Sequence, residues 1–140
     1  MSVVVAIVRF TLGFAAAALT AGAVQALFVA GADGLALDSA RMESLGLLTL
    51  LAATQSAVFA LPFAVLAALV AAWLPIRSRL YFVASGVLIA LAGFSAQYVS
   101  EAGAQTIYNS YALAAYVASG LAAGLMYALV AVPKKPASSV

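Results

Sequence analysis

The stretch that decides the fold covers residues 45–74 and reads LGLLTLLAATQSAVFALPFAVLAALVAAWL. It holds no charged residue, and Gln55 is its most polar side chain. A helix rises ~1.5 Å per residue, so this run is long enough to cross the ~30 Å hydrocarbon core of a bilayer. It does not alternate apolar and polar residues as a barrel strand would. We therefore expect a transmembrane helix, with a kink where Pro62 cannot donate a hydrogen bond to Val58.

Three further apolar runs have the same character, and they cover about residues 3–30, 80–99 and 111–132. Of the 140 residues, 67% are hydrophobic and 7% are charged, whereas soluble domains have about a quarter charged residues. Backbone groups in lipid must bond internally, which favours helices. The sequence predicts one all-α membrane domain over residues 1–140, a polytopic bundle of four transmembrane helices at about 3–30, 45–74, 80–99 and 111–132.

A cleaved secretory signal peptide is the alternative interpretation of the first run. Such a peptide carries its positive charge before the apolar segment, whereas Arg9 follows the apolar residues 3–8. We therefore expect the first run to be a retained helix.

The charged residues are distributed unevenly between the two sides that four crossings define. Both chain ends and the central link share one side, which holds Arg9, Arg77, Arg79, Lys134 and Lys135. The other side holds Arg41 and every acidic residue, namely Asp33, Asp38, Glu43 and Glu101. Lys and Arg favour the cytoplasmic side. We therefore expect both termini to be cytoplasmic.

Small residues recur at four-residue spacing in the first and last helices. Gly120 and Gly124 share one face of the last helix, and Gly13 and Ala17 share one face of the first. Helices in lipid associate through such faces. The pattern predicts close helix packing, and it leaves open whether Gly120 and Gly124 meet this chain or another subunit.

Arg9 is the one ionisable side chain within an apolar run. It lies one or two turns from the cytoplasmic end, so its long side chain can reach the headgroups. We expect it to contact lipid, or a carboxylate of a partner chain.

Polar side chains gather in the outer half of the predicted bundle, and Gln55 is the deepest glutamine among them. This candidate polar layer contains Gln25, Gln55, Ser95 and Gln97. One interpretation is a hydrogen-bonded cluster that fixes helix register. The other is a polar cavity, open to the outside, that binds a small ligand or a quinone headgroup.

The composition argues against catalysis and cofactor binding. There is no cysteine and no histidine, so the commonest general base, thiolate nucleophile and haem ligand are missing. No phosphate-binding loop or metal-ligand spacing is present. A net charge of +2 is too small to indicate nucleic acid. We expect no catalytic residue, no cofactor and no metal.

Two short motif groups resemble known sequences. Leu61-Pro62 is followed by Ile76-Arg77-Ser78, and Ser119-Gly120 leads through Gly124 to Tyr127. In these motifs, over roughly residues 61–132, the chain resembles small four-helix inner-membrane proteins of alphaproteobacteria. The resemblance implies a bacterial inner membrane and no particular activity. Small multidrug resistance transporters also have four helices, but they depend on a glutamate in the first helix, which residues 3–30 lack.

Two functional hypotheses follow. The first is a non-catalytic accessory or structural subunit, which contacts the bilayer and either other membrane subunits or a second copy through its small-residue faces. The second is a small transporter or ligand-binding membrane protein that uses the candidate polar layer.

Overall fold

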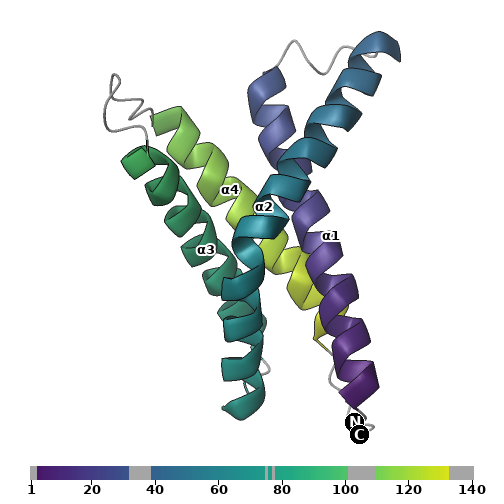
Figure 1. The fold of residues 1–140 in the computed structure, drawn as a ribbon, viewed down its shortest axis with the longest axis vertical. Coiled ribbons are helices and arrows are strands. Elements are labelled where there is room, and N and C mark those ends of the chain that lie inside the picture. The colour runs from purple at the N-terminus through teal and green to yellow at the C-terminus, as the bar shows by residue number, and fades with distance from the viewer. Residues whose placement is uncertain (1–2, 32–38, 75, 77, 101–109, 133–140) are drawn as a thin grey trace, which may run out of the picture.

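The structure is a computed structural model, and it describes residues 3–31, 39–74, 76, 78–100 and 110–132. The described helices are α1 (Val3–Ala30), α2 (Ser39–Trp73), α3 (Arg79–Ser100) and α4 (Ser110–Ala131). All four are long and apolar enough to span a membrane. The prediction of an all-α bundle of four such helices is confirmed (Figure 1).

The helix boundaries match the apolar runs except at the start of α2. α1 has the predicted bounds, and α3 and α4 differ from theirs by one residue at each end. α2 begins at Ser39, whereas the apolar run begins at residue 45. The reason is that Ala40, Met42 and Glu43 are strong helix formers. The charged residues there end the apolar run without ending the helix.

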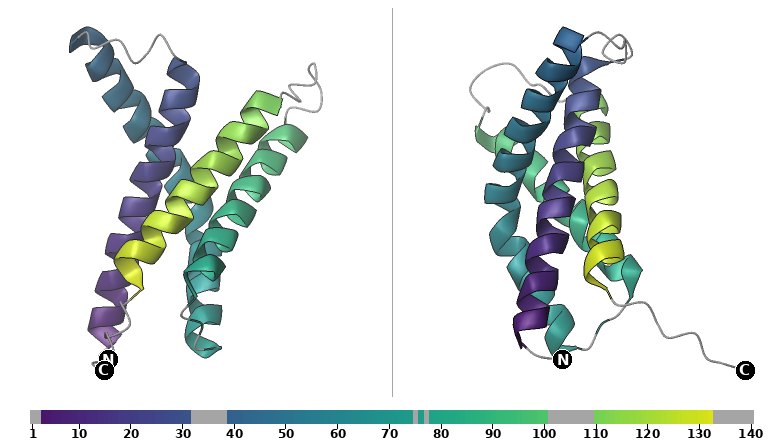
Figure 2. Two further views of the ribbon diagram at one scale, coloured as in Figure 1. Left: turned by 180° about the vertical axis from the view of Figure 1, so that it is seen from behind. Right: turned by 90° about the vertical axis from the view of Figure 1, so that its right-hand side faces the viewer.

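The helices are arranged around α1 and α4, which lie side by side (Figure 2). α2 packs on α1, α3 packs on α4, and α2 has little contact with α3. We call the end of the bundle with Ala30 and Ser110 the loop end, and the end with Val3 and Ala131 the terminal end. Toward the loop end, the α1–α2 hairpin and the α3–α4 hairpin diverge (Figure 1).

Glycines determine where the helices approach most closely. A Cβ on Gly22 of α1 would lie 2.4 Å from the carbonyl oxygen of Thr49 in α2. A Cβ on Gly124 of α4 would lie 2.6 Å from the carbonyl oxygen of Phe82 in α3. Only a residue without a side chain permits such backbone contact.

The core consists of small residues, and the large apolar residues face outward. The buried hydrophobic residues described are all alanines, whereas Leu51, Val58 and Trp73 are exposed, the last to 90%. A protein folded in water would expose a large apolar surface this way and aggregate. In lipid the same arrangement is stable, because close packing rather than hydrophobic burial drives association.

Two tyrosines tie helix ends together. Tyr111 of α4 donates a hydrogen bond of 2.7 Å to the carbonyl oxygen of Phe28 in α1 at the loop end. Tyr81 of α3 donates one of 3.0 Å to the carbonyl oxygen of Ala67 in α2, close to the terminal end.

α2 remains helical through Pro62 and changes direction in its middle part (Figure 1), in agreement with the predicted kink.

Candidate functional site

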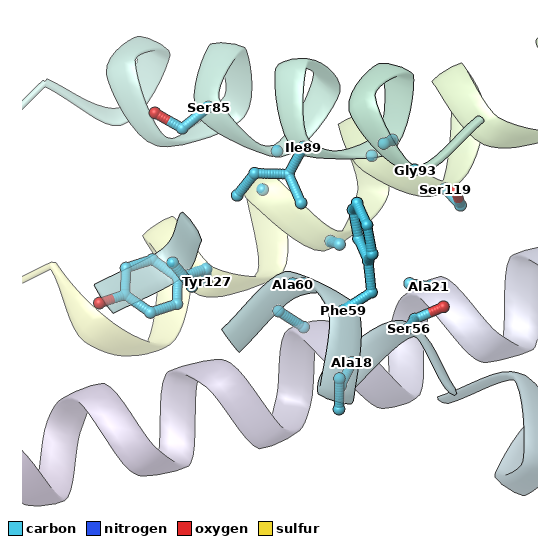
Figure 3. Close-up of a pocket in the computed structure, with 18 of the residues that line it drawn as sticks. Ala18, Ala21, Ser56, Phe59, Ala60, Ser85, Ile89, Gly93, Ser119 and Tyr127 are labelled. Atoms are coloured by element: carbon cyan, nitrogen blue, oxygen red, sulfur yellow. The ribbon is translucent and has the colours of Figure 1, made fainter. Parts of the chain in front are cut away.

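A cavity of about 570 Å³ lies between the helices, and residues of all four line it (Figure 3). Most of its wall consists of alanine and glycine, including Ala21 in α1, Ala60 in α2, Gly93 in α3 and Ala123 in α4. Such short side chains do not fill the space between helix backbones. The same composition that allows close approach at Gly22 therefore leaves a cavity where the helices separate.

Phe59 is a large side chain of the lining that lies between α2 and α3 (Figure 3). It extends from α2 toward α3, where Gly93 faces its ring (Figure 3). A Cβ on Gly93 would lie 3.4 Å from Cε1 of Phe59, which is an ordinary van der Waals contact. Phe59 thus spans the interval between the two helices that otherwise have little contact.

Four polar side chains of the lining form two pairs, each within one hairpin. Gln25 of α1 donates a hydrogen bond of 3.4 Å from Nε2 to Oγ of Ser56 in α2. Tyr116 of α4 donates a short hydrogen bond to Oε1 of Gln97 in α3. Gln55 also lines the cavity, and in the described part of the chain it has no hydrogen bond.

Ser95 stands apart from the other members of the candidate polar layer. It is exposed, it donates to the carbonyl oxygen of Leu91 in its own helix at 2.9 Å, and it does not line the cavity. Successive residues of a helix are ~100° apart, so Ser95 and Gln97 lie on nearly opposite faces. The structure therefore brings Gln25, Gln55 and Gln97 to the cavity and leaves Ser95 outside it.

The lining carries no charged side chain. Its polar groups are the amides of three glutamines and the hydroxyls of serine and tyrosine, which are Ser56, Ser85, Ser119, Tyr116 and Tyr127. Ser119 is buried and donates to the carbonyl oxygen of Tyr116 at 2.8 Å. Every buried side-chain oxygen and nitrogen in the described residues has a hydrogen-bond partner.

Aromatic rings occupy the end of the cavity nearest the terminal end. The ring of Tyr127 lies 5.2 Å from that of Phe82 and 6.2 Å from that of Phe10, measured between centroids. A Cβ on Gly13 would lie 3.1 Å from the ring of Tyr127 and 2.9 Å from Cβ of Ala131. The cavity therefore has an aromatic end and, near the loop end, an amide-bearing end.

The small-residue faces that the sequence singled out are used inside this chain. Gly120 and Gly124 pack on α3, Gly13 packs on α4, and Ala17 lines the cavity. Because α3 covers the Gly120/Gly124 face, this face packs within the chain.

Several charged positions lie at the edge of, or outside, the described structure. Arg9 is partly buried on α1 and has an interaction partner within the chain. The side chain of Arg41 is not described, and the following residues lie outside the described ranges: Asp33, Asp38, Arg77, Glu101, Lys134 and Lys135. Among the described residues, no group of three metal-ligating side chains occurs.

Sequence reasoning did not single out Phe59, Tyr116 or Gly86. A signal for Tyr116 exists, because it lies four residues before Gly120 and so shares the Gly120/Gly124 face. Gly86 and Ala90 have the same small-residue spacing of four as Gly120 and Gly124, and Phe59 and Phe63 are also four residues apart. Such a spacing puts two residues on one helix face, but it does not say which other helix that face meets. No family model, no curated protein and no solved structure matches this chain.

Proposed function

We propose that this chain is a multi-pass protein of a bacterial inner membrane that binds a small, mainly apolar molecule between its helices, either to transport it or to hold it. The supporting observation is the cavity of about 570 Å³ whose lining carries no charge. Ligand sites typically measure ~300–1,000 Å³ and combine an apolar wall with a few polar groups. The amides of Gln25, Gln55 and Gln97 are those polar groups.

The chemistry of the lining favours binding over catalysis. It has no carboxylate, imidazole or thiol, and its hydroxyls have no general base beside them to activate them. We therefore propose no covalent step at this site.

A cavity-filling substitution tests the proposal. Ala60 lines the cavity, and the neighbouring Leu61 is exposed and outside the lining. We expect wild-type protein purified in mild detergent to retain a defined small molecule, detected by mass spectrometry of an organic extract. Ala60→Trp should reduce its amount at least about tenfold, because the indole occupies the space. Leu61→Trp should retain it.

Equal retention by the wild type and both variants would contradict the proposal. So would a wild-type extract that contains only the bulk lipids of the detergent micelle.

A second candidate is the accessory subunit of a larger membrane complex, and the length of the first hairpin favours it. α2 has 35 residues, about 52 Å at ~1.5 Å per residue, whereas α3 and α4 have 22 each, about 33 Å. The α1–α2 hairpin extends beyond the other two helices at the loop end (Figure 1). Met42 and Leu47 are exposed on that extension, at 59% and 58%.

An apolar helix surface beyond the span of α3 and α4 is suited to binding another protein. Affinity purification in mild detergent tests this role. A partner should be lost when Met42 and Leu47 are both replaced by Ser. Purification of the wild type always alone and monomeric would contradict it.

A further inference from the structure

We propose that the ligand is an uncharged amphiphile of the bilayer, with an apolar body and a carbonyl- or hydroxyl-bearing head, and that it enters sideways between α2 and α3. This inference rests on the proposed function and specifies its ligand and route. Prenyl alcohols, quinones and acylglycerols all have such an apolar body and uncharged head.

The charge of the ligand follows from the lining. No Lys, Arg, Asp or Glu contributes to the wall of the cavity. An ion transferred into such an environment without a counter-charge loses several kcal/mol of solvation. A phosphate-bearing or carboxylate-bearing head is therefore disfavoured, and an uncharged head is accepted.

The head is recognised near the loop end. The amide nitrogen of Gln97 and both polar atoms of Gln55 make no hydrogen bond in the described part of the chain. Neither residue is buried, so both remain accessible from the cavity that they line. Together they offer N–H donors and a carbonyl acceptor, which suits a carbonyl head that accepts or a hydroxyl head that both accepts and donates.

The depth of these groups matches an amphiphile that lies in one leaflet. Gln97 is three residues from the end of α3, about 4.5 Å along its axis. With the 33 Å of α3 spanning the hydrocarbon core, Gln97 lies close to the headgroup level. The alanine wall and the ring of Phe82 then lie at the depth of the lipid tails.

The lateral route follows from the helix contacts. Three sides of the bundle are closed by extensive packing, α1 on α2, α1 on α4 and α3 on α4, and the α2–α3 side is not. The hydrogen bond from Tyr81 to Ala67 holds α2 to α3 only near the terminal end. Farther along the same side, the ring of Phe59 lies against Gly93, in the path of a ligand that enters between α2 and α3 (Figure 3).

A tryptophan reporter in the cavity tests both parts of the inference. The chain has one tryptophan, Trp73, at the end of α2. Trp73→Phe with Ile89→Trp places the reporter in the cavity, and Trp73→Phe with Leu88→Trp places it on the exposed side of the same helix. Both are reconstituted in phosphatidylcholine vesicles.

Four probes are added to these vesicles. They are decylubiquinone (uncharged, carbonyl-bearing, quenching), farnesol (uncharged, hydroxyl-bearing, a competitor), brominated phosphatidylglycerol (charged, quenching) and acrylamide (water-soluble, quenching). We expect decylubiquinone to quench the Ile89→Trp reporter at a concentration at least about fivefold below that needed for Leu88→Trp. Farnesol should reverse this quenching. Brominated phosphatidylglycerol should quench only Leu88→Trp.

Each opposite result has a distinct meaning. Quenching of Ile89→Trp by acrylamide would show a water-filled route. Saturable quenching of Ile89→Trp by brominated phosphatidylglycerol would show a charged ligand. Either result overturns the inference and leaves the proposed function standing. Failure of every probe to bind saturably, with no molecule retained on purification, overturns both. Retention of a native molecule that none of the uncharged probes displaces overturns the inference alone.

Two substitutions separate recognition from access. Gln55→Leu should weaken the apparent affinity for decylubiquinone about fivefold, the equivalent of one hydrogen bond. The matched control is Thr54→Val, because Thr54 is exposed, bonds to the carbonyl oxygen of Leu50 and does not line the cavity.

Phe59→Ala should speed association and dissociation together, with a smaller change in affinity. An unchanged rate in Phe59→Ala would contradict the lateral route.

Discussion

Gly86 of α3 and Gly120 of α4 face each other so closely that a Cβ on Gly86 would lie 2.5 Å from the carbonyl oxygen of Gly120. The reverse distance, from a Cβ on Gly120 to the carbonyl oxygen of Gly86, would be 2.7 Å. Backbone atoms cannot move aside as a flexible side chain can. The two helices are therefore in contact through their main chains, and this contact forms one wall of the cavity.

Substituting Gly86 by alanine should destabilise the protein. The added methyl group has to separate α3 from α4, and overpacking of this kind costs ~1–3 kcal/mol. Gly93→Ala is the matched control, because it lies on the same helix and its added Cβ meets only ordinary contacts. There the change should be neutral or stabilising by up to ~1 kcal/mol, from helix propensity. Denaturation in mixed detergent micelles, followed by circular dichroism, measures both. Equal effects of the two substitutions would contradict the close contact.

The outline of this fold could be predicted from hydropathy, because each helix contains one long apolar run. The start of α2 could not, since helix formers such as Ala40 and Glu43 continue a helix past the end of its apolar segment. The packing role of Gly120 and Gly124 is visible as a spacing of four, and their partner Gly86 has a small companion at the same spacing, Ala90. The sequence does not say that these two faces meet.

The candidate site was predictable in part for a similar reason. Depth along the chain groups Gln25, Gln55 and Gln97, which the structure places on the wall of one cavity, but depth carries no information on which way a side chain faces. Ser95 was included by depth and is excluded by its helix face. The cavity itself depends on the divergence of two hairpins, which no local pattern encodes.

Replacing Tyr111 by phenylalanine should loosen the loop end of the bundle. The change removes the hydrogen bond to the carbonyl oxygen of Phe28 and preserves the ring contact, whose centroids lie 5.3 Å apart. Hydrogen bonds between membrane helices contribute about 0.6–2 kcal/mol, so we expect a loss in that range. Hydrogen exchange should show faster exchange at the end of α1 and not near the α2–α3 tie at Tyr81. Uniform acceleration along all four helices would contradict a local role.

The proposed topology predicts opposite accessibility at the two ends of the bundle. Because the chain has no cysteine, a single introduced cysteine is the one thiol that a maleimide can label. Glu43→Cys, at the start of α2, should react with a membrane-impermeant maleimide from the periplasmic side of intact cells. Arg79→Cys, at the start of α3, should react only after the membrane is opened. Labelling of both from the same side would contradict the orientation.

Cross-linking α2 to α3 should stop ligand exchange. Phe59→Cys and Gly93→Cys, combined in the otherwise cysteine-free chain, lie on either side of the interval between these helices. A short bismaleimide should join them, because the ring of Phe59 now reaches Gly93 and the linker takes the place of that ring. Ligand bound before the reaction should then dissociate at least about tenfold more slowly, as the lateral route is closed. Leu61→Cys with Gly93→Cys is the control, since Leu61 is exposed, lies outside the lining and should cross-link poorly. Dissociation at the wild-type rate from the cross-linked protein would mean that the ligand leaves by another side of the bundle.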